Sequence, residues 1–361
     1  MKPRNIAIAC GVAGVAVGLA AAAGIVYHKQ IKSAASLKRL TDYADGYDLY
    51  AIDIAYDYDL DRIIAADVRD DQTYIDAVVA QVLPGAPAHV QAPQFACSAF
   101  AAVDAEGRVR TGRNYDFKDD TSALLVRNHP RDGYASIGFA ALNNLGANAP
   151  LDSIAGRAAA LMGPFAQLDG VNECGVSIAV LTLDSKPCDQ DTQRPVINTS
   201  LAIRLVLDRA ATTQEAVDLL SAYDMHAMAG RDYHFFINDA AGDARVVEWD
   251  PRDPDRAFTA TRVRQVTNFY ACYGDEVLPN QKNGELGHGK ERAIAIADVL
   301  DTHAGAQDEA IAWKALRAAA QEPNPEDITS NTQWSVVFDN AEPAAAITLR
   351  RHWGDVDAFA L

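Results

Sequence analysis

The hydrophobic positions of this chain form short alternating or continuous runs separated by turn residues, with a few longer stretches of helical period between them. Strands or strand pairs are predicted at residues 98–103, 108–115, 120–130, 132–142, 164–183, 232–250, 263–270, 332–339 and 344–353. Amphipathic helices are predicted at residues 199–210, 212–223, 289–303 and 308–321. Strand pairs and helix pairs are segregated along the chain. The pattern therefore indicates stacked antiparallel sheets covered by helices, an α+β layering.

The first strand pair carries polar residues that a hairpin would bring together. Residues 98–103 and 108–115 read as its strands, and the Asp-Ala-Glu-Gly sequence at 104–107 reads as its turn. Such a hairpin folds Arg113 and Asp116 back beside Cys97, so that a thiol, a guanidinium and a carboxylate converge. Taken alone, this arrangement is more typical of a buried structural cysteine next to an ordinary ion pair, so the rest of the chain must decide.

The N-terminal region begins with an uncharged apolar run at residues 5–27 that is long enough to cross a bilayer. Its length favours a membrane anchor over a cleaved signal peptide, and we expect residues 1–28 to be one or the other. The rest of the protein would then lie outside the cytoplasm, either anchored or, after cleavage of this segment, secreted. Positive charges on both sides of the run leave its orientation weakly determined.

An acidic, Tyr-rich stretch follows at residues 41–71 and is interpreted as a solvated helical face. A helix at residues 73–83 should end at the Pro-Gly pair 84–85. The Pro-containing connector 86–96 then leads directly to Cys97. The expected organisation is a segment of modest, helical structure at residues 29–96 and one large domain at residues 97–361.

Composition removes several classes of function. The chain has 361 residues and a net charge of −17, which argues against nucleic acid as a partner because phosphate binding needs clustered Lys and Arg. No histidine pair has zinc-ligand spacing, and neither a P-loop nor a dinucleotide-binding glycine motif occurs, so we expect no metal or other cofactor. The five cysteines suggest no disulfide framework, although a bond between Cys174 and Cys188 is left open.

A thiol that cleaves an amide needs a base and an oxyanion stabiliser. No histidine stands in the sequence context of a catalytic base, and the conspicuous polar turns offer Asn172, Asn268 and Arg292 instead. Each also has a purely structural interpretation. Asn172 suits a left-handed turn position, and Arg292 suits an exposed helix.

Six short motifs occur in a fixed order from Cys97 onward. They are C-S-A-F, G-R-N-x-D-F, D-G-x-N-E-x-G-V, V-T-N, G-x-x-x-x-R and T-Q-W-S. Over about 265 residues this ordered set resembles the choloylglycine hydrolase family, which includes bile salt hydrolases, penicillin V acylases and linear-amide hydrolases. It also looks related to the acid ceramidase and N-acylethanolamine acid amidase branch.

The resemblance implies an N-terminal nucleophile hydrolase with four αββα layers. In this family the nucleophilic cysteine becomes the first residue of the mature chain, and its α-amine acts as the general base. An α-amine has an unperturbed pKa near 8, which suits that role. The chain would therefore be cut between Ala96 and Cys97, and residues 29–96 would act as a propeptide over the cleft.

The matching positions imply roles for the other site residues. Asp116 would orient the amine, Arg113 would favour the thiolate, and Arg292 would brace Asp116. Asn268 would donate its amide to the oxyanion, with Asn172 helping from the opposite wall.

The sequence departs from the bile salt hydrolase pattern at G-H-G-K-E-R, residues 287–292, which favours the linear-amide or penicillin-acylase branch. The expected partners are a small amide with an apolar acyl group and, through residues 1–28, a membrane. The oligomeric state is left open. An acyltransferase and an inactive, membrane-tethered binding protein of the same fold remain alternatives.

Overall fold

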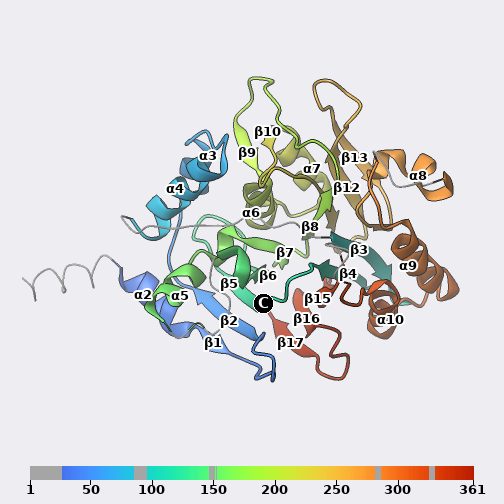
Figure 1. Ribbon diagram of the computed structural model, residues 1–361, viewed down its shortest axis with the longest axis horizontal. Helices are drawn as coiled ribbons and strands as arrows, with labels where there is room; N and C mark the ends of the chain where they lie inside the picture. Colours follow the sequence, from blue (N-terminus) through green and yellow to red (C-terminus); the bar gives the residue numbers. More distant parts are fainter. Residues whose placement is uncertain (1–26, 85–95, 146–150, 152, 281–285, 325–329) are drawn as a thin grey trace, which may run out of the picture.

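The computed structural model describes residues 27–84, 96–145, 151, 153–280, 286–324 and 330–361. Two large sheets pack face to face, and helices cover their outer surfaces (Figure 1). The nine-stranded sheet has the order β1 (Lys38–Arg39), β2 (Leu49–Ile54), β5 (Ala123–Asn128), β6 (Ser136–Ala141), β7 (Gln167–Asn172), β8 (Ser177–Leu183), β11 (Asp232–Asn238), β12 (Arg245–Trp249), β13 (Phe258–Arg262). The six-stranded sheet has the order β14 (Gln265–Val266), β3 (Ala96–Val103), β4 (Val109–Asp116), β15 (Thr332–Asp339), β16 (Ala344–Leu349), β17 (Asp357–Ala360).

The helices complete the four αββα layers. Helices α6 (Thr199–Arg209) and α7 (Thr213–Ser221) pack on the nine-stranded sheet, and α9 (Lys290–Thr302) and α10 (Glu309–Ala319) pack on the six-stranded sheet. Smaller elements lie around this body: α2 (His28–Ser36), α3 (Leu60–Ile64), α4 (Asp71–Val82), α5 (Ile154–Ala160), α8 (Gly274–Asn280), the two-stranded sheet β9 (Val196–Asn198)–β10 (Asp224–His226), and the 3-10 turns Leu142–Leu145, Gly163–Phe165 and Ala271–Tyr273. The predicted α+β layering is confirmed.

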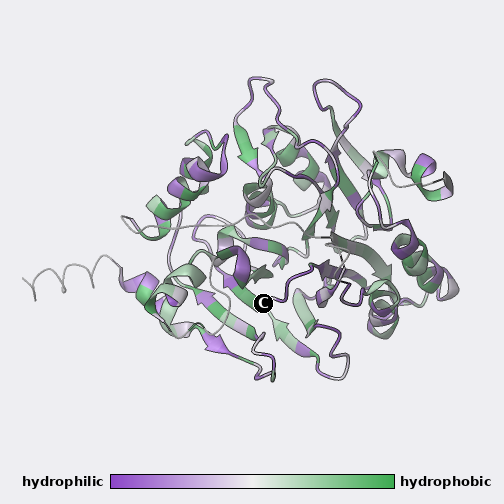
Figure 2. Cartoon of the chain, in the orientation of Figure 1, coloured by the Kyte–Doolittle hydropathy of each residue, from purple (hydrophilic) through white to green (hydrophobic). Residues whose placement is uncertain are grey.

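Apolar side chains fill the space between the layers. Figure 2 shows hydrophobic colour along the central strands and hydrophilic colour over the loops and outer helix faces. Between the sheets, Tyr115 stacks on Trp334 with ring centroids 4.1 Å apart. A second cluster, which includes Phe100 of β3 and Leu316 of α10, lies between the six-stranded sheet and its helices. Burial of this area supplies the main driving force for the fold.

Local capping places α7 where the sequence predicts it. The Thr212 side chain accepts a hydrogen bond from the Glu215 N–H at 3.1 Å, as a capping box requires. The Glu215 carboxylate does not return to Thr212 but accepts from the Ala211 N–H at 2.7 Å. The helix start is therefore satisfied by the expected pair, with the second bond moved by one residue.

The segment at 29–84 is not only helical, and its acidic stretch is not a solvated helical face. Strand β2 joins the nine-stranded sheet by pairing in parallel with β5, where Leu49 aligns with Ala123 and Ile54 with Asn128. Five of its six residues are buried. The buried Tyr74 of α4 donates its hydroxyl hydrogen to the Phe165 carbonyl at 2.6 Å. The apolar residues between the aspartates thus form part of the core, because a sheet edge is available to them.

The predicted membrane segment, residues 1–28, lies outside the described residues except for its last two. Among the residues that the structure does describe, no helix is long and apolar enough to span a bilayer. The predicted connector at 86–96 also lies outside them, apart from Ala96 at the start of β3.

Candidate active site

The predicted hairpin is present, and Cys97 is the second residue of its first strand. Strands β3 and β4 pair so that Cys97 faces Tyr115 and Ala99 faces Arg113, and the turn between them contains Gly107 at a φ of 81°. This left-handed conformation suits glycine because it has no Cβ. The hairpin brings Arg113 and Asp116 close to the thiol, as the sequence predicts.

The Cys97 thiol is fully buried. Burial raises its pKa to about 12, although the charges of Arg113 and Arg292 act in the opposite direction. The thiol is therefore protonated at neutral pH and needs a base before it can attack. The other described cysteines, Cys174, Cys188 and Cys272, are also free thiols, so the Cys174–Cys188 disulfide is not formed in this structure.

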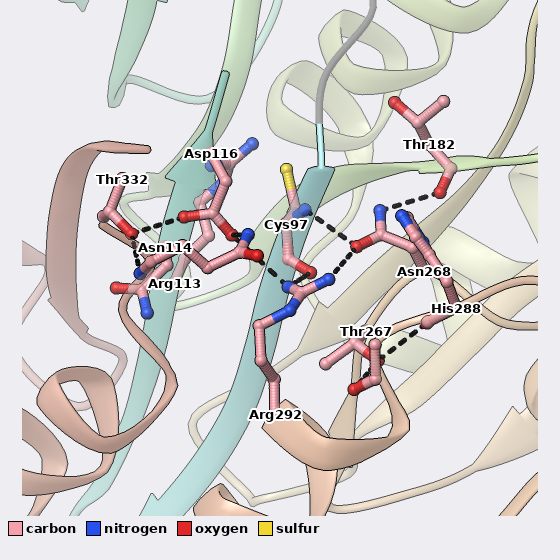
Figure 3. Close-up of polar contacts among 12 residues, drawn as sticks. Cys97, Arg113, Asn114, Asp116, Thr182, Thr267, Asn268, His288, Arg292 and Thr332 are labelled. Carbon is pink, nitrogen blue, oxygen red and sulfur yellow. Dashed lines mark hydrogen bonds and ion pairs between the residues drawn. The ribbon is translucent and has the colours of Figure 1, made fainter. Parts of the chain in front are cut away.

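Arg292, near the start of α9, joins the polar groups around Cys97 (Figure 3). Its Nη1 donates to the Cys97 carbonyl at 2.7 Å and lies 3.3 Å from the Asp116 carboxylate, and its Nη2 donates to Asn268 Oδ1 at 2.7 Å. One planar guanidinium thus fixes three groups at once, which an ammonium with a single nitrogen could not do with the same geometry.

The segment before Arg292 explains the glycines of the G-x-x-x-x-R motif. Gly287 and Gly289 have φ values of 104° and 88°. A Cβ on Gly287 would lie 2.0 Å from the Asn268 carbonyl oxygen, and one on Gly289 would lie 2.8 Å from the Thr267 hydroxyl. Both positions therefore require glycine, and this lets the start of α9 lie directly against the segment that carries Asn268.

Asp116 is fully buried and accepts three hydrogen bonds. Its donors are the Thr332 hydroxyl at 2.6 Å, the Gln321 amide at 2.9 Å and Arg292. Burial raises the pKa of this carboxyl, while Arg292 and the two hydrogen bonds oppose the rise. The expected contact between Asp116 and the α-amine requires the cut chain and stays a prediction, because in the uncut chain the Cys97 nitrogen is a peptide nitrogen with another acceptor. It donates to Asn268 Oδ1 instead, at 3.0 Å.

Asn268 is oriented by partners on both sides of its amide. Its oxygen accepts from Cys97 N and Arg292 Nη2, so its nitrogen must be the atom that donates to the Thr182 carbonyl at 2.8 Å. The Nδ2 group has two hydrogens, and this bond uses one. Asn268 can therefore hold the Cys97 nitrogen and still supply one donor to a substrate oxygen.

Arg113 is fully buried and is paired with a residue that the sequence reasoning left without a role. Its Nε lies 2.8 Å from Asp169 Oδ2, and its guanidinium also lies over the rings of Tyr115 and Trp334. Asp169 is the first residue of the D-G-x-N-E motif, so the signal was present in the sequence. Only the stacking of β7 against β4 assigns the carboxylate to Arg113.

Asn172, in the same motif, does not join the group around Cys97. Its Nδ2 donates to the carbonyls of Leu207 and Ala210, and its Oδ1 accepts from the N–H groups of Cys174 and Val176. These four bonds use its full hydrogen-bonding capacity, which leaves nothing for an oxyanion. Asn172 therefore has a structural role, in which it closes the β7–β8 turn against the end of α6. It is the last residue of β7 and does not occupy the left-handed position that the sequence suggested; in this turn that position belongs to Gly175, at a φ of 82°.

The Arg113–Asp169 pair predicts a dependence of stability on pH. Burial raises the pKa of Asp169 from its usual 3.8 to about 6, although Arg113 opposes the rise. The folded protein then holds a proton that the unfolded chain releases between pH 4 and 6. This group therefore costs the folded state stability as the pH rises through that window. At about 1.4 kcal/mol for each pKa unit, the change is at most about 3 kcal/mol.

We expect the free energy of unfolding of the protein with Asp169 to fall, relative to that of the Asp169→Asn variant, as the pH rises from 4 to 6. The reason is that the asparagine amide does not titrate in this range. The measurement is urea unfolding at pH 4, 6 and 8, in a Cys97→Ala background so that both proteins remain single chains. The opposite result, a free energy of unfolding that rises with pH in the protein with Asp169 relative to the variant, would contradict the prediction. It would show that the carboxylate is ionised and paired with Arg113 throughout this range.

Comparison with known proteins identifies the family to which the chain belongs. The model of the acyl-coenzyme A:6-aminopenicillanic acid acyl-transferase family matches residues 103–352. The chain belongs to this family. No curated protein sequence matches the chain.

Solved structures agree with the fold of this family member. A mutant of the conjugated bile acid hydrolase from Clostridium perfringens is similar with a TM-score of 0.57 at 15% identity, over 73% of this chain and 92% of that one. The penicillin V acylase from Agrobacterium tumefaciens gives a TM-score of 0.53 at 20% identity, over 73% and 86%. The resemblance predicted from the ordered motifs is confirmed at the level of family and fold.

Proposed function

We propose that this protein is an amidohydrolase in which Cys97, once it is the first residue of the mature chain, attacks the carbonyl carbon of a linear amide. The observation that carries the proposal is the set of contacts around the Cys97 backbone. Its nitrogen donates to Asn268 Oδ1 and its carbonyl accepts from Arg292, so the new terminus would be held on both sides of the Cα.

In the proposed reaction, the free α-amine of Cys97 takes the thiol proton, and the thiolate forms a bond to the amide carbon. The remaining Nδ2 hydrogen of Asn268 stabilises the negative oxygen. The amine product leaves with the proton, and a thioester remains on Cys97. Water then attacks this thioester and releases the acid.

The same thioester could pass its acyl group to an amine, and the name of the matching family, an acyl-transferase, favours that second function. The two functions differ only in the acceptor. Adding a second amine during turnover should leave the yield of free acid unchanged in a hydrolase, whereas it should convert the acid into a new amide in an acyltransferase.

The substrate class is tested with a panel of N-acyl amino acids, penicillin V and a conjugated bile acid, assayed by amine release. We expect simple N-acyl amides to give the highest kcat/KM, because the segment at 287–292 departs from the bile salt hydrolase pattern. The apolar strands β5 and β6 are buried in the nine-stranded sheet, so they offer no support for an acyl-binding wall there. Preferred turnover of the bile acid would contradict this choice of branch. No turnover of any amide by the processed protein would contradict the function itself.

Processing is expected to leave the N-terminal fragment bound to the mature chain. Strand β2 lies inside the nine-stranded sheet next to β5, and Tyr58 donates to Asp208 Oδ2 at 2.8 Å. Cutting before Cys97 breaks none of these contacts. Size-exclusion chromatography should therefore yield one species that separates into two chains only under denaturing conditions. A mature chain that elutes without its fragment would show that the two parts do not hold together.

A further inference from the structure

The segment that carries Asn268, residues 267–272, is attached to the nine-stranded sheet by two buried side chains that have no part in the proposed chemistry. These are His234 on β11 and Glu248 on β12, both fully buried. His234 Nε2 lies 3.0 Å from the Thr267 carbonyl oxygen. The Glu248 carboxylate accepts from the N–H groups of Ala271 and Cys272, at 3.0 and 2.6 Å. The pair therefore holds the segment on both sides of Asn268.

The partners determine what the His234 ring does. A carbonyl oxygen only accepts, so Nε2 must carry its hydrogen. The other ring nitrogen, Nδ1, lies 3.0 Å from Glu248 Oε2, so the carboxylate fixes the ring orientation. With both nitrogens engaged and the side chain buried, His234 is not available as a base for a substrate. Its role is structural: it connects the Thr267 carbonyl to Glu248.

The hydrogen bond from His234 to the Thr267 carbonyl fixes the backbone next to Asn268. The Thr267 carbonyl lies in the same rigid peptide plane as the Asn268 nitrogen, so His234 fixes the plane before this residue. The plane after it is fixed by the Asn268 carbonyl, which accepts from His288 N at 2.8 Å. With both planes held, the Asn268 side chain has little freedom beyond its own rotamer, and its amide lies between Cys97 and Thr182.

We propose that His234 and Glu248 are positioning residues that hold Asn268 in the orientation needed to stabilise the oxyanion. The proposal rests on the function proposed above for Asn268. A separate anchor lies two residues further on, where the Tyr270 hydroxyl donates to the buried Asp232. Because that anchor persists without His234, loss of the histidine should shift the peptide before Asn268 without releasing the whole segment.

The test is His234→Leu in the processed enzyme, with an N-acyl amide as substrate. We expect kcat to fall by about 10- to 100-fold while KM changes little, because misplacement of a donor affects the transition state more than the bound substrate. The rate of Cys97 alkylation by iodoacetamide should stay within about twofold of wild type, since alkylation develops no oxyanion. His234→Gln, which keeps one N–H donor, should recover part of kcat.

The matched control is His226→Leu. His226 has the same arrangement, with Nδ1 2.9 Å from Asp189 and Nε2 3.0 Å from the Gln190 carbonyl, but it holds a different loop. This variant should keep kcat. Glu248→Gln provides a second test if His234→Leu does not fold, and it should also lower kcat selectively.

Unchanged kcat in both His234→Leu and Glu248→Gln would overturn the proposal, as would an equal loss of kcat and alkylation rate. Failure of the proposed function is a different result. In that case wild-type protein would be alkylated at Cys97 but would release amine from no amide, and the variants could not differ in turnover.

Discussion

Replacing Cys97 with alanine is expected to abolish amide cleavage and to leave the chain uncut between Ala96 and Cys97. Both reactions need the same sulfur atom, because Arg292 and Asn268 supply only hydrogen bonds and charge to Cys97. Cys97→Ser should be cut slowly or not at all, because an alcohol is harder to ionise than a thiol. Intact mass and N-terminal sequencing measure the cut, and amine release measures the activity.

The control for this prediction is Cys174→Ala. Cys174 is another free thiol, half-buried in the β7–β8 turn, and its loss should change neither the cut nor the turnover. Full activity in Cys97→Ala would contradict the assignment of the nucleophile and leave the binding-protein alternative standing. An active wild-type enzyme that still carries Ala96 joined to Cys97 would contradict the free-amine mechanism alone.

Replacing Asn268 with alanine is expected to lower kcat by about a hundredfold or more, as for other oxyanion donors. The variant removes the donor aimed at the substrate oxygen and also the oxygen that accepts from Cys97 N and Arg292. Steady-state kinetics on the processed protein measure the effect, and thermal unfolding checks that the fold is intact. A rise in KM with unchanged kcat would make Asn268 a binding residue.

Asn268→Asp separates the two roles of this side chain. A carboxylate still accepts from Cys97 N and Arg292, but it has no hydrogen to donate to the oxyanion or to the Thr182 carbonyl. We therefore expect normal cutting before Cys97 together with a loss of kcat similar to that of Asn268→Ala. Near-normal turnover in Asn268→Asp would mean that Asn268 acts mainly by holding the amine, and that another group binds the oxyanion.

The local elements of this protein follow from its sequence because short-range physics specifies them. Alternating side chains and a turn glycine are sufficient for the β3–β4 hairpin, and the Thr212 cap is sufficient for the start of α7. The order of the six motifs was sufficient to identify the family. Cys97, Asp116 and Arg292 come together as predicted, because two of them share one hairpin and the third begins a helix that packs on it.

Strand β2 was missed because its sequence supports two outcomes. Apolar residues interleaved with aspartates fit an exposed helical face, but they also fit a strand when a partner strand exists. That partner is β5, which is about 70 residues away in the chain. Pairing between distant strands has no local signal, so only the assembled sheet decides it.

The sequence by itself determined the hairpin, the layered α+β class, the family and the residue types of the site. The tertiary structure decided which polar groups meet. It pairs Arg113 with Asp169, and it uses all four hydrogen bonds of Asn172 within a turn. It also directs the oxygen of Asn268 towards Cys97 and holds the segment before Asn268 through the contact with His234. The physical reason is that a hydrogen bond depends on direction and on distances of a few tenths of an ångström, and for residues far apart in the chain these are set only when the two sheets stack.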